Sequence, residues 1–231
     1  MSINTIKSNI SLIKERVSNA AHKVGRDDSE IKIIAVTKMV GADEVIEVGN
    51  CGLTDMAENR VQLLQQKLSD KRIIKQNFTW HLIGHLQTNK VNTVLPLVSL
   101  IHSIDSIKLA KEIDKQASKL GTEVHGLMQL NISKEESKYG FYEDEIDNFL
   151  FEVEKMNYLK IDGIMTMAPH TENVEQIRNI FKKANAIFID LSSHAVHNIN
   201  MLHLSMGMSN DFEIAIEEGA TLIRLGTSIF Y

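Results

Sequence analysis

Lys38 occupies a position in this sequence that could support covalent chemistry. It directly follows Ile33-Ile34-Ala35-Val36-Thr37, an apolar and β-branched run that predicts a buried strand. A lysine at the end of such a strand keeps its stem among apolar neighbours, and its amine can act as a nucleophile toward an aldehyde. The plainer interpretation is a solvated lysine just past a strand. Position alone leaves both open.

Two segments that combine glycine with hydroxyl groups could bind an anion. Ser205-Met206-Gly207 and Gly226-Thr227 each follow a candidate strand. Glycine lets backbone N–H groups approach an anion closely, and hydroxyl groups donate further hydrogen bonds. Taken singly, either segment could be an ordinary turn. Arg224 lies two residues before Gly226, so it would point to the same side of its strand and pair there with a ligand or with an internal carboxylate.

These residues lie near the ends of short strands that alternate with helical segments. Apolar residues at helical spacing predict a helix over residues 3–24, ahead of the first strand. Further helical spacing occurs in residues 110–120, 146–156 and 174–187. The eight predicted strands are Ile31–Val36, Leu53–Ala57, Phe78–Ile83, Leu100–Ser103, Val124–Asn131, Leu159–Met165, Met201–Ser205 and Thr221–Leu225.

Eight alternations of strand and helix predict a (β/α)8 TIM barrel with an extra N-terminal helix, in one domain over residues 1–231. An open, doubly wound sheet is the competing topology. Its usual signature is missing, because no Gly-x-Gly-x-x-Gly follows a candidate strand, and no Gly-x-x-x-x-Gly-Lys occurs either. In a barrel the strand ends meet at one face, which would place Lys38 opposite the two glycine-containing segments. That arrangement favours a phosphorylated ligand that carries a carbonyl group.

The composition and charge of the sequence exclude several classes of protein. Lys and Arg total 25 against 30 Asp and Glu, a formal net charge of −5, and no basic block offers contacts to a nucleic acid. The longest apolar stretch, residues 94–101, is too short for a bilayer, and the first residues lack the apolar core of a signal peptide. A cytoplasmic protein without membrane contact is therefore expected. Cys51 is the single cysteine, which excludes a disulfide within the chain.

The histidines do not predict a metal site. His81 and His85 are four residues apart, a spacing that suits a metal only on a helix, and His81 falls in a predicted strand. The remaining histidines near one loop are interpreted as surface or packing residues: His194, His197 and His203.

Eight short motifs follow one another along the chain. They are Ala35-Val36-Thr37-Lys38, Glu58-Asn59-Arg60-Val61-Gln62, Trp80-His81-Leu82-Ile83-Gly84-His85-Leu86-Gln87, His102-Ser103-Ile104-Asp105-Ser106, Ser137-Lys138-Tyr139-Gly140, Gly163-Ile164-Met165-Thr166-Met167, Leu204-Ser205-Met206-Gly207-Met208-Ser209 and Arg224-Leu225-Gly226-Thr227-Ser228-Ile229-Phe230. With these motifs the chain resembles the pyridoxal-phosphate homeostasis proteins, single-domain relatives of the alanine racemase barrel, over about residues 33–230.

The resemblance implies a cofactor and a set of residues that hold it. Pyridoxal 5′-phosphate (PLP) would form a covalent aldimine with Lys38, and Arg224 would face its pyridine nitrogen. The residues implied at the phosphate are Ser205, Met206 through its backbone, Gly226 and Thr227. Asn59 and His85 would line the pocket, and Lys138 would accept or relay the cofactor.

The chain departs from the family pattern twice. Ala57 stands before Glu58 where members usually have glycine, and the sequence stops at Tyr231 where members tend to continue with glycine and a basic residue. Neither position touches Lys38 or the phosphate segments, although the second bears on any C-terminal contact.

The resemblance implies a PLP-binding protein of intracellular vitamin B6 homeostasis and amino-acid and keto-acid balance, a monomer or weak homodimer whose recipients would be PLP-dependent apo-enzymes. A permanently charged arginine opposite the ring nitrogen makes a weaker electron sink than an aspartate would. The 231 residues are also expected to leave no room for the second domain of the racemases. The alternative is a PLP-dependent racemase or other weak enzyme, with His85 or Lys138 as second acid–base group. A cofactor-free aldolase using Lys38 would leave Arg224 without a role.

Overall fold

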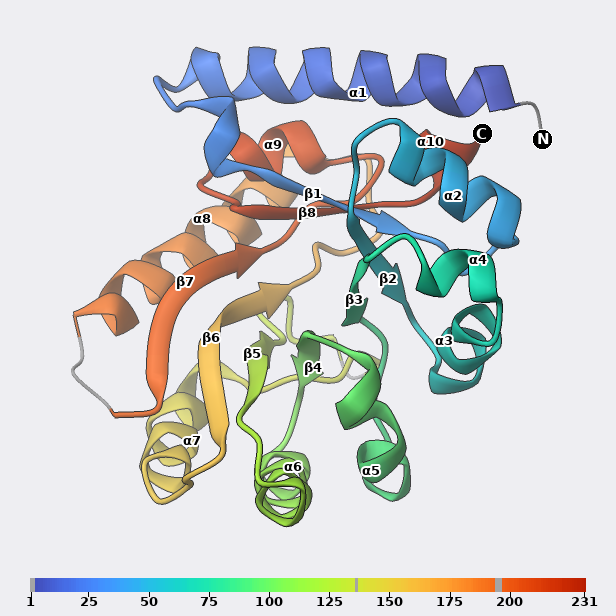
Figure 1. Cartoon of the computed structure of the whole chain (residues 1–231). Helices are drawn as coiled ribbons and strands as arrows, with labels where there is room; N and C mark the ends of the chain where they lie inside the picture. Colours follow the sequence, from blue (N-terminus) through green and yellow to red (C-terminus); the bar gives the residue numbers. More distant parts are fainter. Residues whose placement is uncertain (1–2, 136, 194–196) are drawn as a thin grey trace.

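The computed structural model describes residues 3–135, 137–193 and 197–231. Eight parallel strands form a closed barrel in sequence order, and the last strand pairs with the first (Figure 1). The strands are β1 (Lys32–Val36), β2 (Asp55–Glu58), β3 (Thr79–Leu82), β4 (Leu100–Ile104), β5 (Val124–Leu130), β6 (Leu159–Thr166), β7 (Ile199–Ser205) and β8 (Leu222–Leu225). The predicted TIM barrel is confirmed, and the open sheet is excluded by the pairing of β1 with β8.

Helices surround the barrel and follow its strands (Figure 1). They are α1 (Ile3–Lys23), α2 (Ala42–Asn50), α3 (Val61–Leu68), α4 (Lys71–Ile74), α5 (Val91–Val94), α6 (Ile107–Leu120), α7 (Ile146–Val153), α8 (Val174–Ser192), α9 (Phe212–Glu217) and α10 (Thr227–Phe230), with 3-10 turns η1 (Asp28–Glu30), η2 (Thr88–Lys90), η3 (Leu95–Leu97) and η4 (Glu143–Glu145). The predicted N-terminal helix is confirmed as α1, which packs on α2, α9 and α10 through the buried Ile6, Ile10 and Ile13.

Strand alternation divides the buried apolar residues into two groups. Successive side chains of a strand point to opposite faces, so each strand feeds both the barrel interior and the layer beneath the helices. The larger core lies in that outer layer. The smaller, interior cluster consists of Ile34, Val36, Ala57, Leu100, Leu127, Met165 and Leu222. The interior is therefore a packed core, as in other barrels of this type.

Gly163 allows two neighbouring strands to approach at a kink. The register between β6 and β7 shifts between Ile161 and Gly163, and Gly163 has a φ of +145°. A Cβ atom at this position would lie 1.8 Å from the carbonyl oxygen of His203 on β7. Only glycine fits this conformation and this contact.

Among the residues that the structure describes, no helix is both long enough and apolar enough to cross a membrane.

Candidate functional site

The carboxyl ends of the strands surround a cavity of about 1020 Å³. A drug-sized ligand or cofactor takes a pocket of roughly 300–1,000 Å³. The predicted site residues that line the cavity are Lys38, Asn59, Lys138, Arg224, Gly226 and Thr227. Further lining comes from the segment between β6 and α8 and from the segment between β7 and α9. The barrel thus brings residues from distant parts of the sequence to one end of the sheet.

Lys38 follows β1 and is exposed at the mouth of the cavity. The residue before it is held firmly: the Thr37 N–H donates to the Ala57 carbonyl at 3.0 Å, and its hydroxyl donates to Glu58 Oε1 at 2.7 Å. Glu58 is fully buried and pairs with Lys67 Nζ at 2.6 Å. These contacts fix the end of β1 from the outer side of the barrel, so the Lys38 backbone is anchored while its amine stays accessible.

The segments after β7 and β8 are joined at the edge of the cavity. Ser209 Oγ accepts a hydrogen bond from the Ser228 N–H at 3.1 Å, and the two hydroxyl oxygens also lie 3.1 Å apart. Gly207 has a φ of +90°, and a Cβ atom there would lie 2.6 Å from Ala215 Cβ of α9. Glycine therefore allows the segment after β7 to fold against α9.

Gly226 and Thr227 stand at the start of α10 and line the cavity. Within this turn the Ser228 N–H bonds to Ser209 Oγ and the Ile229 N–H bonds to the Gly226 carbonyl, so Thr227 supplies the N–H and hydroxyl that could bind an anion. Ser209, which also lines the cavity, was not among the predicted site residues. Its signal was available, because it follows Ser205 by four residues in the same glycine-containing segment.

Arg224 is buried at the base of the cavity and 4% exposed. Its Nη1 donates to Ser205 Oγ at 2.6 Å, and its Nη2 donates to the Thr166 carbonyl at 3.0 Å. Burial lowers the pKa of Arg224 to about 10, and the charge of Asp211 acts in the opposite direction. The guanidinium is still protonated at neutral pH, so it presents a positive charge to the cavity.

The structure places Ser205 and Met206 behind the cavity rather than on its lining. Ser205 is fully buried, and its hydroxyl contacts Arg224 and, at 2.9 Å, His102 Nδ1. Met206 is fully buried in the outer core, and its N–H donates to the Leu222 carbonyl at 3.1 Å. Their roles at a phosphate remain predictions from the resemblance.

Lys138 and Asn59 offer polar atoms to the cavity. Lys138 Nζ donates to the Ala168 carbonyl at 3.1 Å and pairs with Glu135 Oε1 at 2.6 Å. Asn59 Oδ1 is buried without a hydrogen-bond partner among the described residues. A buried acceptor without a partner is costly, and a ligand with a donor group would satisfy it.

His85 lies outside the cavity lining. Its Nδ1 is 2.6 Å from Asp105 Oδ2, and its ring stacks on the exposed ring of Tyr139 with centroids 4.0 Å apart. His81 is buried inside the barrel on β3, so the two histidines do not share a site. In the described part of the chain, no three His, Cys, Asp or Glu side chains are grouped so that they could hold a metal ion. His194 lies outside the described residues.

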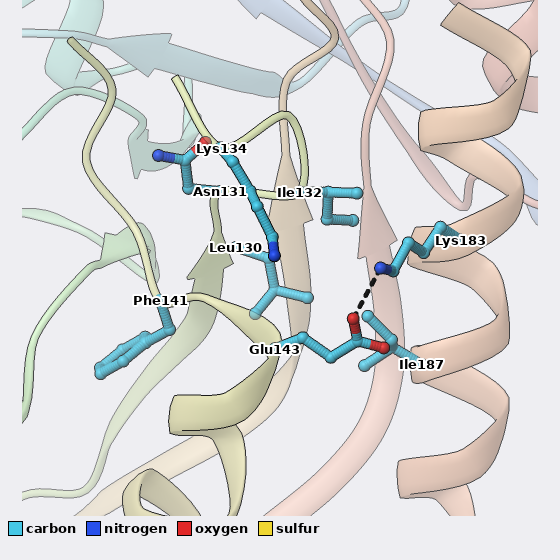
Figure 2. Close-up of a pocket in the computed structure, with 8 residues that line it drawn as sticks. All are labelled: Leu130, Asn131, Ile132, Lys134, Phe141, Glu143, Lys183 and Ile187. Carbon is cyan, nitrogen blue, oxygen red and sulfur yellow. Dashed lines mark ion pairs between the residues drawn. The ribbon is translucent and has the colours of Figure 1, made fainter. Parts of the chain in front are cut away.

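A second hollow lies between the end of β5 and α8 (Figure 2). Figure 2 shows the ion pair of Lys183 and Glu143 among the residues that line the hollow. Lys183 Nζ lies 2.6 Å from Glu143 Oε2. Its volume is about 10 Å³, roughly the room for one water molecule. It is therefore too small for a cofactor, and the large cavity is the candidate site.

Comparisons with known proteins agree with this geometry. Residues 2–231 match the family model described as alanine racemase, N-terminal domain. The chain is 38% identical to the pyridoxal phosphate homeostasis protein of Aquifex aeolicus over 96% of its length and 95% of the relative's length. It therefore belongs to the alanine racemase N-terminal domain family and, within it, to the pyridoxal phosphate homeostasis proteins.

Two solved structures are similar over nearly the whole chain. The crystal structure of an unknown protein from Bifidobacterium adolescentis has a TM-score of 0.89 and 30% identity, and the match covers 99% of this chain and 95% of that one. PipY of Synechococcus elongatus PCC7942, solved with PLP bound, has a TM-score of 0.82 and 29% identity, over 95% of this chain and 100% of that one.

Proposed function

We propose that this protein binds PLP in the large cavity and acts in intracellular PLP homeostasis. The observation that carries the proposal is the arrangement of the cavity lining: an accessible amine at Lys38, a buried guanidinium at the base and the start of α10 at the edge. An amine can react with the aldehyde of PLP, a guanidinium can face its pyridine ring, and N–H and hydroxyl groups can bind its phosphate. The names of the relatives and the PLP-bound PipY structure support the same ligand.

Different residues would hold the different groups of the cofactor. Lys38 would hold the aldehyde end of the cofactor: a neutral amine can join an aldehyde carbon as a C=N bond, with its two hydrogens and the aldehyde oxygen released as water. Gly226 and Thr227 would bind the phosphate through N–H and hydroxyl groups, and Ser209, which lines the same cavity, would add a further hydroxyl. Arg224 faces the ring, and Asn59 Oδ1 accepts a hydrogen bond from the ligand. When bound, PLP supplies a reactive aldehyde and an electron-withdrawing ring.

The proposed role is storage and delivery rather than catalysis. A charged guanidinium disfavours a proton on the ring nitrogen and so weakens the ring as an electron sink. Such a site suits a protein that holds PLP away from free amines in the cytoplasm and passes it to apo-enzymes. The racemase alternative requires a second acid–base group. Of the two candidates, Lys138 lines the cavity and His85 does not, and the Lys138 amine is held by Ala168 and Glu135.

The visible spectrum and a borohydride experiment test the binding proposal. Purified protein incubated with PLP is expected to show a visible absorption band, and reduction is expected to leave the cofactor's mass on Lys38 in a peptide map. Lys38→Ala should lose both signals, whereas Lys134→Ala, an exposed lysine outside the cavity, should keep them. A normal band in Lys38→Ala would contradict the covalent assignment.

Proton exchange separates the carrier from the racemase. The loaded protein is incubated in D2O with single amino acids, and their α-proton signals are followed by NMR. A carrier leaves these signals unchanged over many hours. Sustained, stereospecific loss of one α-proton signal would establish enzymatic activity. If that exchange then stopped in Lys138→Ala, Lys138 would be identified as the acid–base group.

A further inference from the structure

A chain of buried polar side chains runs from Arg224 through the barrel interior to its opposite end. Ser205 Oγ is 2.6 Å from Arg224 Nη1 and 2.9 Å from His102 Nδ1. His102 Nε2 is 3.0 Å from His81 Nδ1, and His81 Nε2 is 3.1 Å from Asp55 Oδ1. Arg224, Ser205, His102, His81 and Asp55 are all at least nine-tenths buried. Five strands contribute one residue each: β8, β7, β4, β3 and β2.

The chemistry of the donors gives this chain a single direction. A guanidinium can only donate and the Asp55 carboxylate can only accept, so with neutral histidine rings Ser205 Oγ accepts from Arg224 and turns its own hydrogen to His102 Nδ1. His102 then carries its proton on Nε2 and donates to His81 Nδ1. His81 in turn carries its proton on Nε2 and donates to the Asp55 carboxylate. Ser205, His102 and His81 then each donate and accept once, an arrangement in which both histidine rings are neutral.

The two end groups of this series of hydrogen bonds, Arg224 and Asp55, carry opposite charges. Arg224 pairs with no carboxylate in the described residues, since both of its hydrogen bonds to protein go to neutral oxygens. A buried charge is expensive unless it is compensated. The carboxylate at the far end is Asp55, which also lies 3.2 Å from Lys32 Nζ. Aligned hydrogen bonds polarise one another, so the carboxylate stabilises the guanidinium through the neutral groups between them.

We propose that Asp55, His81, His102 and Ser205 form a positioning relay that compensates the charge of Arg224 and sets how strongly its guanidinium acts on a ligand in the cavity. The inference rests on the proposed function, because the ligand whose ring faces Arg224 is PLP. It adds that residues without contact to the ligand would affect how the ligand is held. Groups at the amino-terminal ends of the strands tune the electronic state of a cofactor bound at the carboxyl-terminal ends.

Other charged groups face the relay and have to be considered with it. Lys32 of β1 contacts Asp55, and His203 of β7 interacts electrostatically with His81 and Asp55. Asp162 of β6 acts on His203. Asp211, at the start of α9, acts on Arg224 from the other side. Burial lowers the pKa of His102 well below its ordinary value, which agrees with the neutral state that the hydrogen-bond directions require.

The cofactor-free protein provides the first test. Long-range ¹H–¹⁵N spectra distinguish the two neutral forms of a histidine ring from the charged form. We expect both His81 and His102 to be neutral at pH 7, each with its proton on Nε2, with assignments from His81→Gln and His102→Gln. A proton on His102 Nδ1, or a charged ring, would contradict the assigned direction of the hydrogen bonds and overturn the proposal.

The loaded protein provides the second test, through the pH midpoint of its visible absorption band. His102→Leu breaks the relay without changing the formal charge, and Asp55→Asn keeps the hydrogen bond but removes the carboxylate charge. Both leave the guanidinium more electropositive, so each is expected to lower the midpoint by about 0.5 pH unit. His102→Gln, which retains a donor and an acceptor, should lie closer to the wild type.

Asp162→Asn is the matched control, because Asp162 is also a buried carboxylate near this end of the barrel but bonds to His125 outside the relay. Its shift should be less than half that of Asp55→Asn. Unchanged midpoints in both His102→Leu and Asp55→Asn, or equal shifts in Asp55→Asn and Asp162→Asn, would overturn the relay. Absence of any visible band in the wild type would instead refute the proposed function. The ¹H–¹⁵N spectra of the cofactor-free protein would still decide the direction of the hydrogen bonds.

Discussion

Thr227 combines a hydroxyl with a backbone N–H at the start of α10, on the edge of the cavity. If it holds the phosphate, Thr227→Ala should weaken PLP binding about tenfold, which is the loss of one hydrogen bond to a charged group. Thr227→Ser should bind PLP almost as well as the wild type. The measurement is equilibrium binding of PLP and of pyridoxal, which lacks the phosphate. Equal weakening for both ligands would place Thr227 elsewhere in the site.

Two serines show how far a site can be predicted at the level of single residues. Ser205 was predicted at the phosphate, yet the structure buries it beneath Arg224, whereas Ser209 lines the cavity. The sequence indicates a segment rich in glycine and hydroxyl groups, but not the turn within it. Gly207, with its positive φ, turns the chain between the two serines, and only the packing of that turn on α9 determines which hydroxyl reaches the cavity.

Gly163 matters for the way two elements, β6 and β7, lie together. Gly163→Ala would drive a Cβ atom into the His203 carbonyl and require an unfavourable φ, so we expect a loss of about 3 kcal/mol or more in the free energy of unfolding. Gly121→Ala is the control, because that glycine has a φ of +64° but open space around it. It should cost about 1 kcal/mol. Urea unfolding of both variants measures the difference, and equal losses would show that the contact with β7 is not limiting.

The strands and long helices could be predicted because their signal is local. Spacing of three and four residues marks α1, and short β-branched runs mark the strands, whose bounds differ from the prediction by a few residues at most. The relay inside the barrel could not be predicted in this way. Its members lie on five strands, and their contacts depend on strand register and on the side to which each residue points. His81 and His102 are ordinary strand residues until the barrel closes around them.

For the molecule as a whole, His102 and His203 contribute to the dependence of stability on pH. Burial lowers the pKa of His102 far below 6.5, and the pKa of His203 moves in the same direction. Below about pH 6.5 the unfolded chain therefore binds protons that the folded protein does not, and stability falls as the pH falls. The fully buried His102 contributes a slope of up to about 1.4 kcal/mol per pH unit, and the half-buried His203 acts in the same direction.

His102→Gln removes one of these groups, so its unfolding free energy should fall less steeply between pH 6.5 and pH 5. Urea unfolding at several pH values measures the slope, with His22→Gln, an exposed histidine at the end of α1, as the control. An unchanged slope in His102→Gln would mean that this ring is charged in the folded protein. Such a result would also contradict the direction assigned to the relay.

The seam between β1 and β8 has a consequence for the order of events during synthesis. Lys38 follows the first strand, whereas Arg224, Gly226 and Thr227 belong to the last strand and the helix after it. A ribosome adds roughly 5–20 residues per second, so the amine waits on the order of ten seconds or more for the rest of the cavity. A nascent chain carries the nucleophile without the groups that select its ligand. A ligand held by Lys38 and by Arg224 or Thr227 together therefore requires that β8 has paired with β1.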